Sequence, residues 1–242
     1  MTVRWLARGM GDVPDSDGWL SPAESARLRT TRFPKRHTEL RLSRWVAKQA
    51  IAQVLGLDTG HGTLARVEVG RAPTGAPVAT VDGAPAPVSV SLTDRADWAV
   101  CVVAPADHDV GCDLELVEPR TDVFVQDWFT PRERAAVAAG EHDLLANLVW
   151  SAKESALKVL QTGLRRDTRS VEVEILDRNG HAHWSRLVVR AREGVVFPGW
   201  WRRYGDFLVT VAARVDHGPP VCLEQPPSLA GATPSHGWLT QP

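Results

Sequence analysis

Apolar residues recur at helical spacing among many basic residues over positions 21–57, and this pattern predicts helices with one face in a core. Helical spacing returns from position 131 to about 163. Ser21, Pro22 and Glu24 stand in the order typical of a helix start. Strand-like patterns follow each helical stretch, so the sequence predicts the same helix-then-strands order twice.

Several strands are predicted between and after these helices. Val and Leu alternate with Ser and Thr over 88–93, while 98–103 is a continuous apolar run typical of a buried strand. Gly, Pro and Ala over 71–87 predict a turn-rich connection, and Pro105 to His108 predicts a hairpin turn into a third strand at 109–116. Further strands are expected at 171–175, 187–190 and 206–212.

The third strand carries two carboxylates on one side. Alternation along the strand places Gly111, Asp113 and Glu115 on the face opposite Cys112 and Leu114. Two acidic residues at this spacing put hard oxygen ligands within reach of one cation such as Mg²⁺. Alone the pair is a weak signal, because exposed strand faces often carry acidic residues for solubility.

A charged stripe is predicted on the second helical segment. Trp150, Glu154 and Lys158 stack at i, i+4 and i+8, with Lys153 on the adjoining flank. A Glu-to-Lys pair is common on solvated helices. The large aromatic beside the carboxylate instead indicates a half-buried face, where charges need a functional or structural reason.

Composition narrows the class of protein. The chain has 242 residues with 43% hydrophobic content, enough for a substantial core. Its net charge of −1 offers no global positive field for nucleic acid. No apolar stretch suits a signal peptide or a membrane span, so a cytoplasmic location without membrane contact is expected. The three cysteines, Cys101, Cys112 and Cys222, lack any paired spacing and are expected to be buried reduced thiols.

Two motifs together resemble a known family. Gly111-Cys112-Asp113-Leu114-Glu115 matches G-x-D-x-E, and the segment from Trp150 to Lys158 matches W-x-x-K-E-x-x-x-K, of phosphopantetheinyl transferases of the surfactin-synthetase type. Between them, the segment from Phe129 to Glu133 is similar to the F-T-x-x-E element of that family. Gly163-Leu164 also fits, and the similarity runs from about 27 to 215.

The resemblance implies an α/β fold of two similar halves related by a pseudo-two-fold axis, with the site in the cleft between them. The expected divisions are 1–108 with a basic coenzyme A-binding region, 109–215 with both motifs, and a Pro-rich tail at 216–242. The tail is expected either to drape over the body or to be disordered, and Trp238 is a candidate anchor. Two fused halves also imply a monomer.

The resemblance further implies Mg²⁺ and coenzyme A, with transfer of 4'-phosphopantetheine to a serine of an acyl or peptidyl carrier protein and release of 3',5'-ADP. Asp113, Glu115 and Glu154 would hold Mg²⁺. Glu154, or a water that it orients, would take the proton of the serine hydroxyl, and Lys158 would stabilise the departing ADP. The residues expected to contact coenzyme A are Arg36, Arg41, Arg44, Ser91, Thr93, Lys153 and Lys158.

The sequence departs from the family on the strand before the acidic strand. Members commonly carry Ser-His-Ser or Ser-His-Thr, whereas this chain has Leu92 between Ser91 and Thr93. Leucine has no donor, so one charge-assisted phosphate contact of about 1.5 to 3 kcal/mol would be missing. By sequence, His37 and His108 are the nearest alternatives.

A second departure lies at 74–77, where the family often has a basic residue between Gly and Pro. Arg71 could compensate for it. Three functions therefore stay open on sequence alone: a working transferase, an enzyme repurposed for another reaction such as cyclisation or elimination, and a non-catalytic module that docks a carrier protein.

Overall fold

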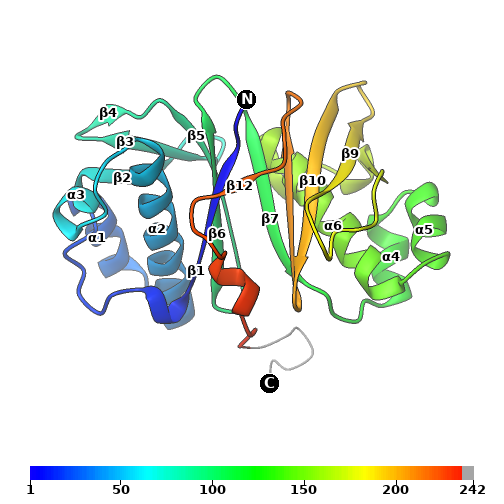
Figure 1. Ribbon diagram of the computed structural model, residues 1–242, viewed down its shortest axis with the longest axis horizontal. Helices are drawn as coiled ribbons and strands as arrows, with labels where there is room; N and C mark the ends of the chain where they lie inside the picture. The colour runs from blue at the N-terminus through cyan, green and yellow to red at the C-terminus, as the bar shows by residue number, and fades with distance from the viewer. Residues whose placement is uncertain (236–242) are drawn as a thin grey trace.

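The chain folds into two layered halves, and the computed structural model describes residues 1–235 (Figure 1). In the first half, α1 to α3 lie on the outer side of a sheet (Figure 1). The elements of this half are β1 (Arg4–Gly9), α1 (Pro22–Thr30), α2 (Pro34–Val54), α3 (His61–Arg66), β2 (Val67–Arg71), β3 (Pro77–Val81), β4 (Ala84–Pro85), β5 (Val88–Arg95) and β6 (Trp98–Pro105).

The second half places its helices on the opposite outer side, so the two sheets lie in the middle of the molecule (Figure 1). The β7 strand connects this half to the first half and is buried along its whole length. The elements of this half are β7 (Val110–Leu116), α4 (Asp122–Trp128), α5 (Pro131–Ala138), α6 (His142–Val159), β8 (Val171–Ile175), β9 (Ser185–Ala191), β10 (Val196–Tyr204) and β11 (Phe207–Ala213).

Two main sheets and one small sheet organise the described residues. The strand orders are β12-β1-β6-β5 and β7-β11-β10-β9-β8, and β2-β3-β4 forms the small sheet, with β12 spanning Val221–Cys222. Apolar side chains from both main sheets, including Trp5, Val102, Phe207 and Val209, form one buried cluster. Separate clusters lie between α2 and the first sheet and between α6 and the second sheet. The predicted α/β fold class is confirmed.

The same buried ion pair supports each half. Ser21 and Glu24 form a capping box at the start of α1, and the Glu24 carboxylate pairs with Lys48 of α2. The backbone N–H of Val69 on β2 donates to Glu24 Oε1 at 3.0 Å. Together these contacts join the start of α1 to α2 and to β2.

The second half repeats these contacts. Thr130 and Glu133 form the capping box of α5, the Glu133 carboxylate lies 2.8 Å from Lys153 Nζ, and the N–H of Val173 on β8 donates to Glu133 Oε1 at 2.7 Å. The two halves are thus related residue by residue at these positions, as the predicted pseudo-two-fold symmetry requires.

Four sequence-based expectations need correction. Residues 105–108 do not form a hairpin turn, because β7 pairs with β11 and belongs to the other sheet. The helical stretch from 131 divides into α5 and α6, and Gly140 lies in the connection, where a Cβ atom would come within 2.4 Å of the Leu145 side chain. The N-terminal strand β1 was not predicted, and strands β2 and β3 replace much of the expected turn-rich connection.

The tail drapes over the body as far as residue 235. Its β12 strand pairs in parallel with β1, Leu229 is fully buried, and Ser228 Oγ donates to the carbonyl of Ala7 at 2.8 Å. The candidate anchor Trp238 lies outside the described residues. Across residues 1–235, no helix is both long and apolar enough to cross a membrane.

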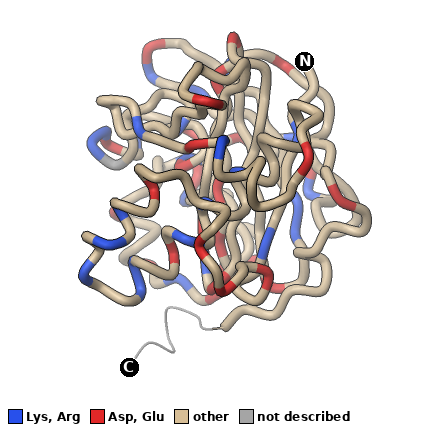
Figure 2. The backbone as a smooth tube through the Cα atoms, turned by 90° about the vertical axis from the view of Figure 1, so that its left-hand side faces the viewer, with Lys and Arg blue, Asp and Glu red and all other residues tan. Residues whose placement is uncertain are grey.

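Charge is distributed rather than gathered on one face in the side view of the chain. Figure 2 shows Lys and Arg segments interspersed with Asp and Glu segments along the backbone. This distribution matches the near-zero net charge. Cys101 and Cys112 are buried and free, as predicted, while Cys222 is free and half-buried.

Candidate functional site

A close approach between β7 and α6 brings the two motifs together. A Cβ atom at Gly111 would lie 2.0 Å from the backbone oxygen of Ser155, so only glycine lets the helix lie this close to the strand. Ser155 and Ser151 also hydrogen-bond Thr210 of the neighbouring β11 at 2.7 and 2.9 Å. The glycine of G-x-D-x-E is therefore a packing requirement that sets the distance between Asp113 and the helix.

Asp113 lies at the centre of the site and is 6% exposed. Lys158 Nζ donates to Asp113 Oδ1 at 2.9 Å, and Thr93 Oγ1 donates to the same oxygen at 3.1 Å. Burial lowers the pKa of Lys158, but the charges of Asp113, Cys112 and Glu154 and the hydrogen bond to Asp113 together outweigh this effect and raise that pKa above its ordinary value. Lys158 is therefore a permanent cation in the cleft.

Within residues 1–235, two buried carboxylate oxygens have no hydrogen-bond partner. They are Asp113 Oδ2 and Glu154 Oε1. Burial and then repulsion from Asp113 raise the pKa of Glu154 to about 7, whereas Lys158 acts in the opposite direction. A bare buried carboxylate oxygen is costly. The donor set of hard oxygens close to one another fits a divalent cation of the Mg²⁺ type.

Glu115 is already paired. Trp150 Nε1 donates to Glu115 Oε1 at 3.0 Å, Arg120 Nη2 donates to Oε2 at 3.3 Å, and Arg95 Nε lies 3.4 Å from Oε2. Burial and Asp113 raise the pKa of Glu115 to about 7, while the two arginines counteract them. No group of three or more His, Cys, Asp or Glu side chains in residues 1–235 is arranged to hold a metal ion. The predicted triad is thus brought to one region without converging on one point.

A cavity of about 690 Å³ opens beside this centre, between the two halves. Residues of both halves line it, and its size suits a ligand of cofactor dimensions. Its cationic members are Arg44, Arg71, Lys158 and Arg165. Sequence reasoning missed Arg165, which follows Gly163-Leu164 and donates from Nη2 to the carbonyl of Thr74 at 2.9 Å, across the mouth between the halves.

Ser91 and Thr93 join the halves. The N–H of Cys112 donates to Ser91 Oγ at 3.0 Å, and the N–H of Leu114 donates to Thr93 Oγ1 at 3.2 Å. These hydroxyls satisfy the edge of β7 that faces β5. Leu92, on the other side of β5, lines the large cavity. The residue that stands where the family commonly has a histidine therefore lies on the wall of this cavity.

The predicted basic residues divide into two groups. Arg44, 4% exposed, lines the large cavity, and desolvation by burial lowers its pKa to about 10 despite the opposing charge of Glu24. Arg36 is exposed and lines a smaller hollow of about 180 Å³ that also contains Arg44 and Leu92. Arg41 instead holds the 14–17 loop, donating to the carbonyl of Asp15 at 3.1 Å.

Lys153 lies in the core and not in the cleft, which corrects its expected contact with coenzyme A. Its side chain is 0% exposed. Besides pairing with Glu133, its amino group donates to the carbonyls of Thr168 at 2.9 Å and Val171 at 2.7 Å. The buried pair fixes α6 against α5 and β8, so Lys153 supports the site through the fold.

A second cavity of about 500 Å³ adjoins the acidic side of the centre. Thr93, Asp113 and Glu115 line it together with Glu39 and Asp94. Desolvation, followed by repulsion from Glu39, raises the pKa of Asp94. Asp113 therefore lies on the wall of one cavity while its partner Lys158 lines the other.

The first half lacks this chemistry at the equivalent positions. Leu6 of β1 pairs with Cys101, the fourth residue of the neighbouring antiparallel strand β6, and Asp113 of β7 pairs with Thr210, the fourth residue of its neighbour β11. Arg8 therefore takes the position of Glu115. The W-x-x-K spacing occurs in both α2 and α6, and the residue that follows it is Gln49 in α2 and Glu154 in α6. Arg8 Nε donates to Gln49 Oε1 at 2.8 Å. The acidic centre is thus specific to the second half.

Comparison with known proteins identifies the region that carries both motifs. Residues 109–197 match the 4'-phosphopantetheinyl transferase superfamily. Among solved structures, the chain is similar to the holo-[acyl-carrier-protein] synthase of Neisseria meningitidis, with 17% identity, 42% of this chain and 94% of that chain covered, and a TM-score of 0.35.

The chain is also similar to the Helicobacter pylori holo-[acyl-carrier-protein] synthase in complex with coenzyme A. There the identity is 15%, the coverage is 43% of this chain and 99% of that chain, and the TM-score is 0.35. No curated protein sequence matches the chain.

Proposed function

We propose that this chain is a phosphopantetheinyl transferase of the surfactin-synthetase type, and the match of residues 109–197 to the superfamily supports the proposal. It would transfer 4'-phosphopantetheine from coenzyme A to a serine of an acyl or peptidyl carrier protein. The observation that carries the proposal is the pair of bare, buried oxygens of Asp113 and Glu154 beside Lys158, at the edge of a two-half cavity lined by cations.

The chain's own residues suit this reaction. Lys158, Arg44 and Arg71 line the cavity and would bind the phosphates of coenzyme A, with Lys158 nearest the acidic centre. Glu154, or a water that it orients, would accept the proton of the serine hydroxyl. Lys158 stays protonated and would stabilise the charge of the departing 3',5'-ADP.

Asp113 and Glu154 are the residues that would hold Mg²⁺. When bound, the cation would neutralise phosphate charge and help align the phosphoryl group. Thr93 and Lys158 fix one oxygen of Asp113 and leave the other available. The cytoplasmic location and the monomeric state stay predictions.

Intact-mass analysis tests the proposal directly. An apo acyl or peptidyl carrier protein incubated with this protein, coenzyme A and Mg²⁺ should gain the mass of phosphopantetheine. A carrier in which the acceptor serine is replaced by alanine is the matched control. An unchanged mass for carriers of both kinds would exclude the proposed transfer.

One observation favours a second candidate function. Leu92 places an apolar side chain on the cavity wall where a histidine would meet a phosphate. A cavity remodelled in this way suits an enzyme that uses the same cleft for another reaction on a biosynthetic intermediate, such as cyclisation or elimination. Failure to bind coenzyme A would favour this alternative.

A further inference from the structure

Glu115 is held by side chains from three separate elements. The indole N–H of Trp150 comes from α6, the guanidinium of Arg120 comes from the 117–121 connection, and Arg95 comes from the end of β5 in the first half. Both of its oxygens therefore face donors. Glu115 is 9% exposed, so water contributes little to its solvation.

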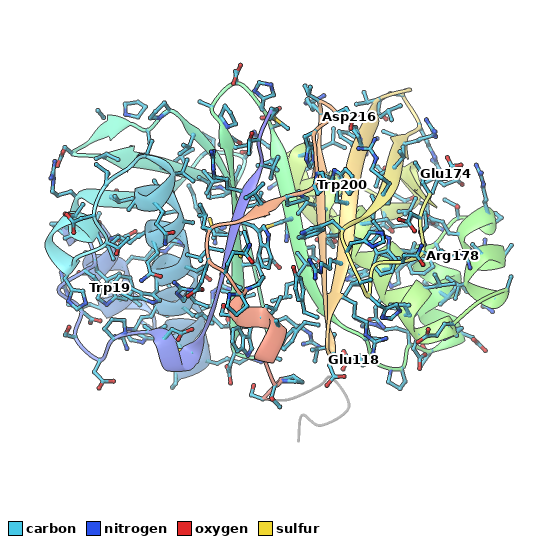
Figure 3. All side chains as sticks on the ribbon, in the orientation of Figure 1. Trp19, Glu118, Glu174, Arg178, Trp200 and Asp216 are labelled. Atoms are coloured by element: carbon cyan, nitrogen blue, oxygen red, sulfur yellow. The ribbon has the colours of Figure 1, made fainter. Side chains whose placement is uncertain are left out.

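The donors are themselves fixed. Arg120 Nε donates to Asn147 Oδ1 at 2.7 Å, and Asn147 Nδ2 donates to the carbonyl of Glu118 at 2.7 Å. Arg95 Nη2 donates to Glu118 Oε1 at 2.6 Å. Glu118 lies low in the molecule, beyond the end of β7 (Figure 3). The result is a closed network around one carboxylate.

The contrast with the other two motif carboxylates is sharp. Asp113 Oδ2 and Glu154 Oε1 are buried without a partner. Glu115 would have to leave two guanidinium groups and an indole to reach a cation, and those buried cations would then lose a partner. The cation that neutralises Glu115 is thus supplied by the protein.

We propose that Glu115 is a positioning residue and that Asp113 and Glu154 alone supply the carboxylate ligands of the metal. This inference rests on the proposed function for the identity of the site. Through Arg95, Glu115 ties β7 to the first half, and through Trp150 it ties β7 to α6. It therefore fixes the separation of Asp113 and Glu154, as supporting residues do around metal ligands.

Metal affinity tests this role without relying on turnover. Mn²⁺ is titrated into the full chain, with free Mn²⁺ measured by electron paramagnetic resonance. We expect Asp113→Asn and Glu154→Gln to weaken Mn²⁺ binding at least about tenfold, and Glu115→Gln, which keeps the side-chain volume and an acceptor oxygen, to weaken it by a clearly smaller factor. Equal weakening by Glu115→Gln and Asp113→Asn would overturn the proposal.

A conservative variant covers the case in which Glu115→Gln does not fold. Arg120→Lys keeps the charge but loses the planar fork that reaches both Glu115 and Asn147. We expect its Mn²⁺ affinity to stay within about threefold of wild type, while kcat falls at least about fivefold at saturating Mg²⁺ and the KM for Mg²⁺ is unchanged. A raised KM for Mg²⁺ with unchanged kcat would contradict a positioning role.

The two proposals can fail separately. Absence of phosphopantetheine transfer by the wild-type protein would remove the proposed function, and the Mn²⁺ titrations of the Asp113, Glu115 and Glu154 variants would still decide the ligand set. Conversely, transfer that persists while Glu115→Gln abolishes Mn²⁺ binding would reject only the positioning role.

Discussion

Lys158 Nζ lies 2.9 Å from Asp113 Oδ1 and 2.8 Å from the carbonyl oxygen of Cys112, so one ammonium group joins α6 to β7 inside the cleft. The pair leaves Asp113 with one satisfied oxygen and one bare oxygen. This arrangement orients the carboxylate before any ligand enters.

Replacement of Lys158 should show what the ammonium contributes. Lys158→Met removes the cation beside Asp113, and we expect kcat to fall about 100-fold because charge on the departing ADP is no longer stabilised. Lys158→Arg should lower kcat less, because it keeps a cation beside Asp113. Initial rates of carrier modification at saturating Mg²⁺ measure both, with the exposed Arg132→Met as control. Equal rates for Lys158→Met and wild type would remove Lys158 from the reaction.

The stability of the metal-free protein should depend on pH through Glu154. Its pKa is raised from 4.5 to about 7 in the folded protein, so the folded state binds the proton more tightly than the unfolded state. Its contribution is fully present below about pH 4.5 and is lost as the pH rises through about 7. Glu154→Gln should therefore flatten the loss of stability between about pH 5 and pH 8.

Urea unfolding at a series of pH values measures this effect. The exposed Glu141→Gln is the matched control and should keep the wild-type pH dependence. Glu115, whose pKa is also raised to about 7, should leave a residual slope in the Glu154 variant. A Glu154→Gln curve parallel to that of wild type would show that Glu154 is not buried as described.

The Leu92→His variant distinguishes a coenzyme A-dependent transferase from an enzyme repurposed for another reaction. If coenzyme A binds in the large cavity, a histidine on its wall should add a phosphate contact and tighten binding by about tenfold, for roughly 1.5 kcal/mol. If the wall serves an apolar ligand, the unpaired imidazole should weaken the native activity. Calorimetric titration of coenzyme A in the presence of Mg²⁺ measures whether Leu92→His binds coenzyme A more tightly or more weakly than wild type. Leu92→Met is the control for a change of side-chain shape without a new donor.

Lys153→Met should destabilise the fold without a direct effect on coenzyme A. Loss of one partner leaves the buried Glu133 carboxylate uncompensated, which costs about 3–5 kcal/mol of unfolding free energy. Lys48→Met, which breaks the equivalent pair of the first half, should lower the unfolding free energy by a similar amount. Coenzyme A affinity, measured where Lys153→Met is still folded, should stay within about twofold of wild type. Specific loss of that affinity would return Lys153 to the binding site.

Much of the site could be predicted because its pattern is local. Strand alternation placed Asp113 and Glu115 on one side, and helical spacing aligned Trp150, Glu154 and Lys158. Periodicity does not say what a flank faces, so Lys153 was assigned to the ligand although Glu133 lies beside it in space. The partner of Lys153 comes from another helix and leaves no signal at short spacing.

Pairing between strands was harder to predict. The pattern over residues 98–116 predicts a hairpin. In the structure, the hydroxyls of Ser91 and Thr93 accept hydrogen bonds from one edge of β7. The other edge of β7 pairs with β11, which lies about 100 residues later in the chain. Arg95 was not singled out for the same reason. Its role depends on Glu115, which is distant from Arg95 along the chain.

The equivalence of the two halves has a consequence for stoichiometry. Leu6, Arg8 and Gln49 give the first half an internally bonded counterpart of the acidic centre that contains no carboxylate, with Arg8 also paired to Glu224 of the tail. Across the described residues 1–235, the two related halves therefore offer a single set of bare carboxylate oxygens. A donor titration of this chain should saturate at one equivalent, with a hyperbolic curve and no interaction between sites.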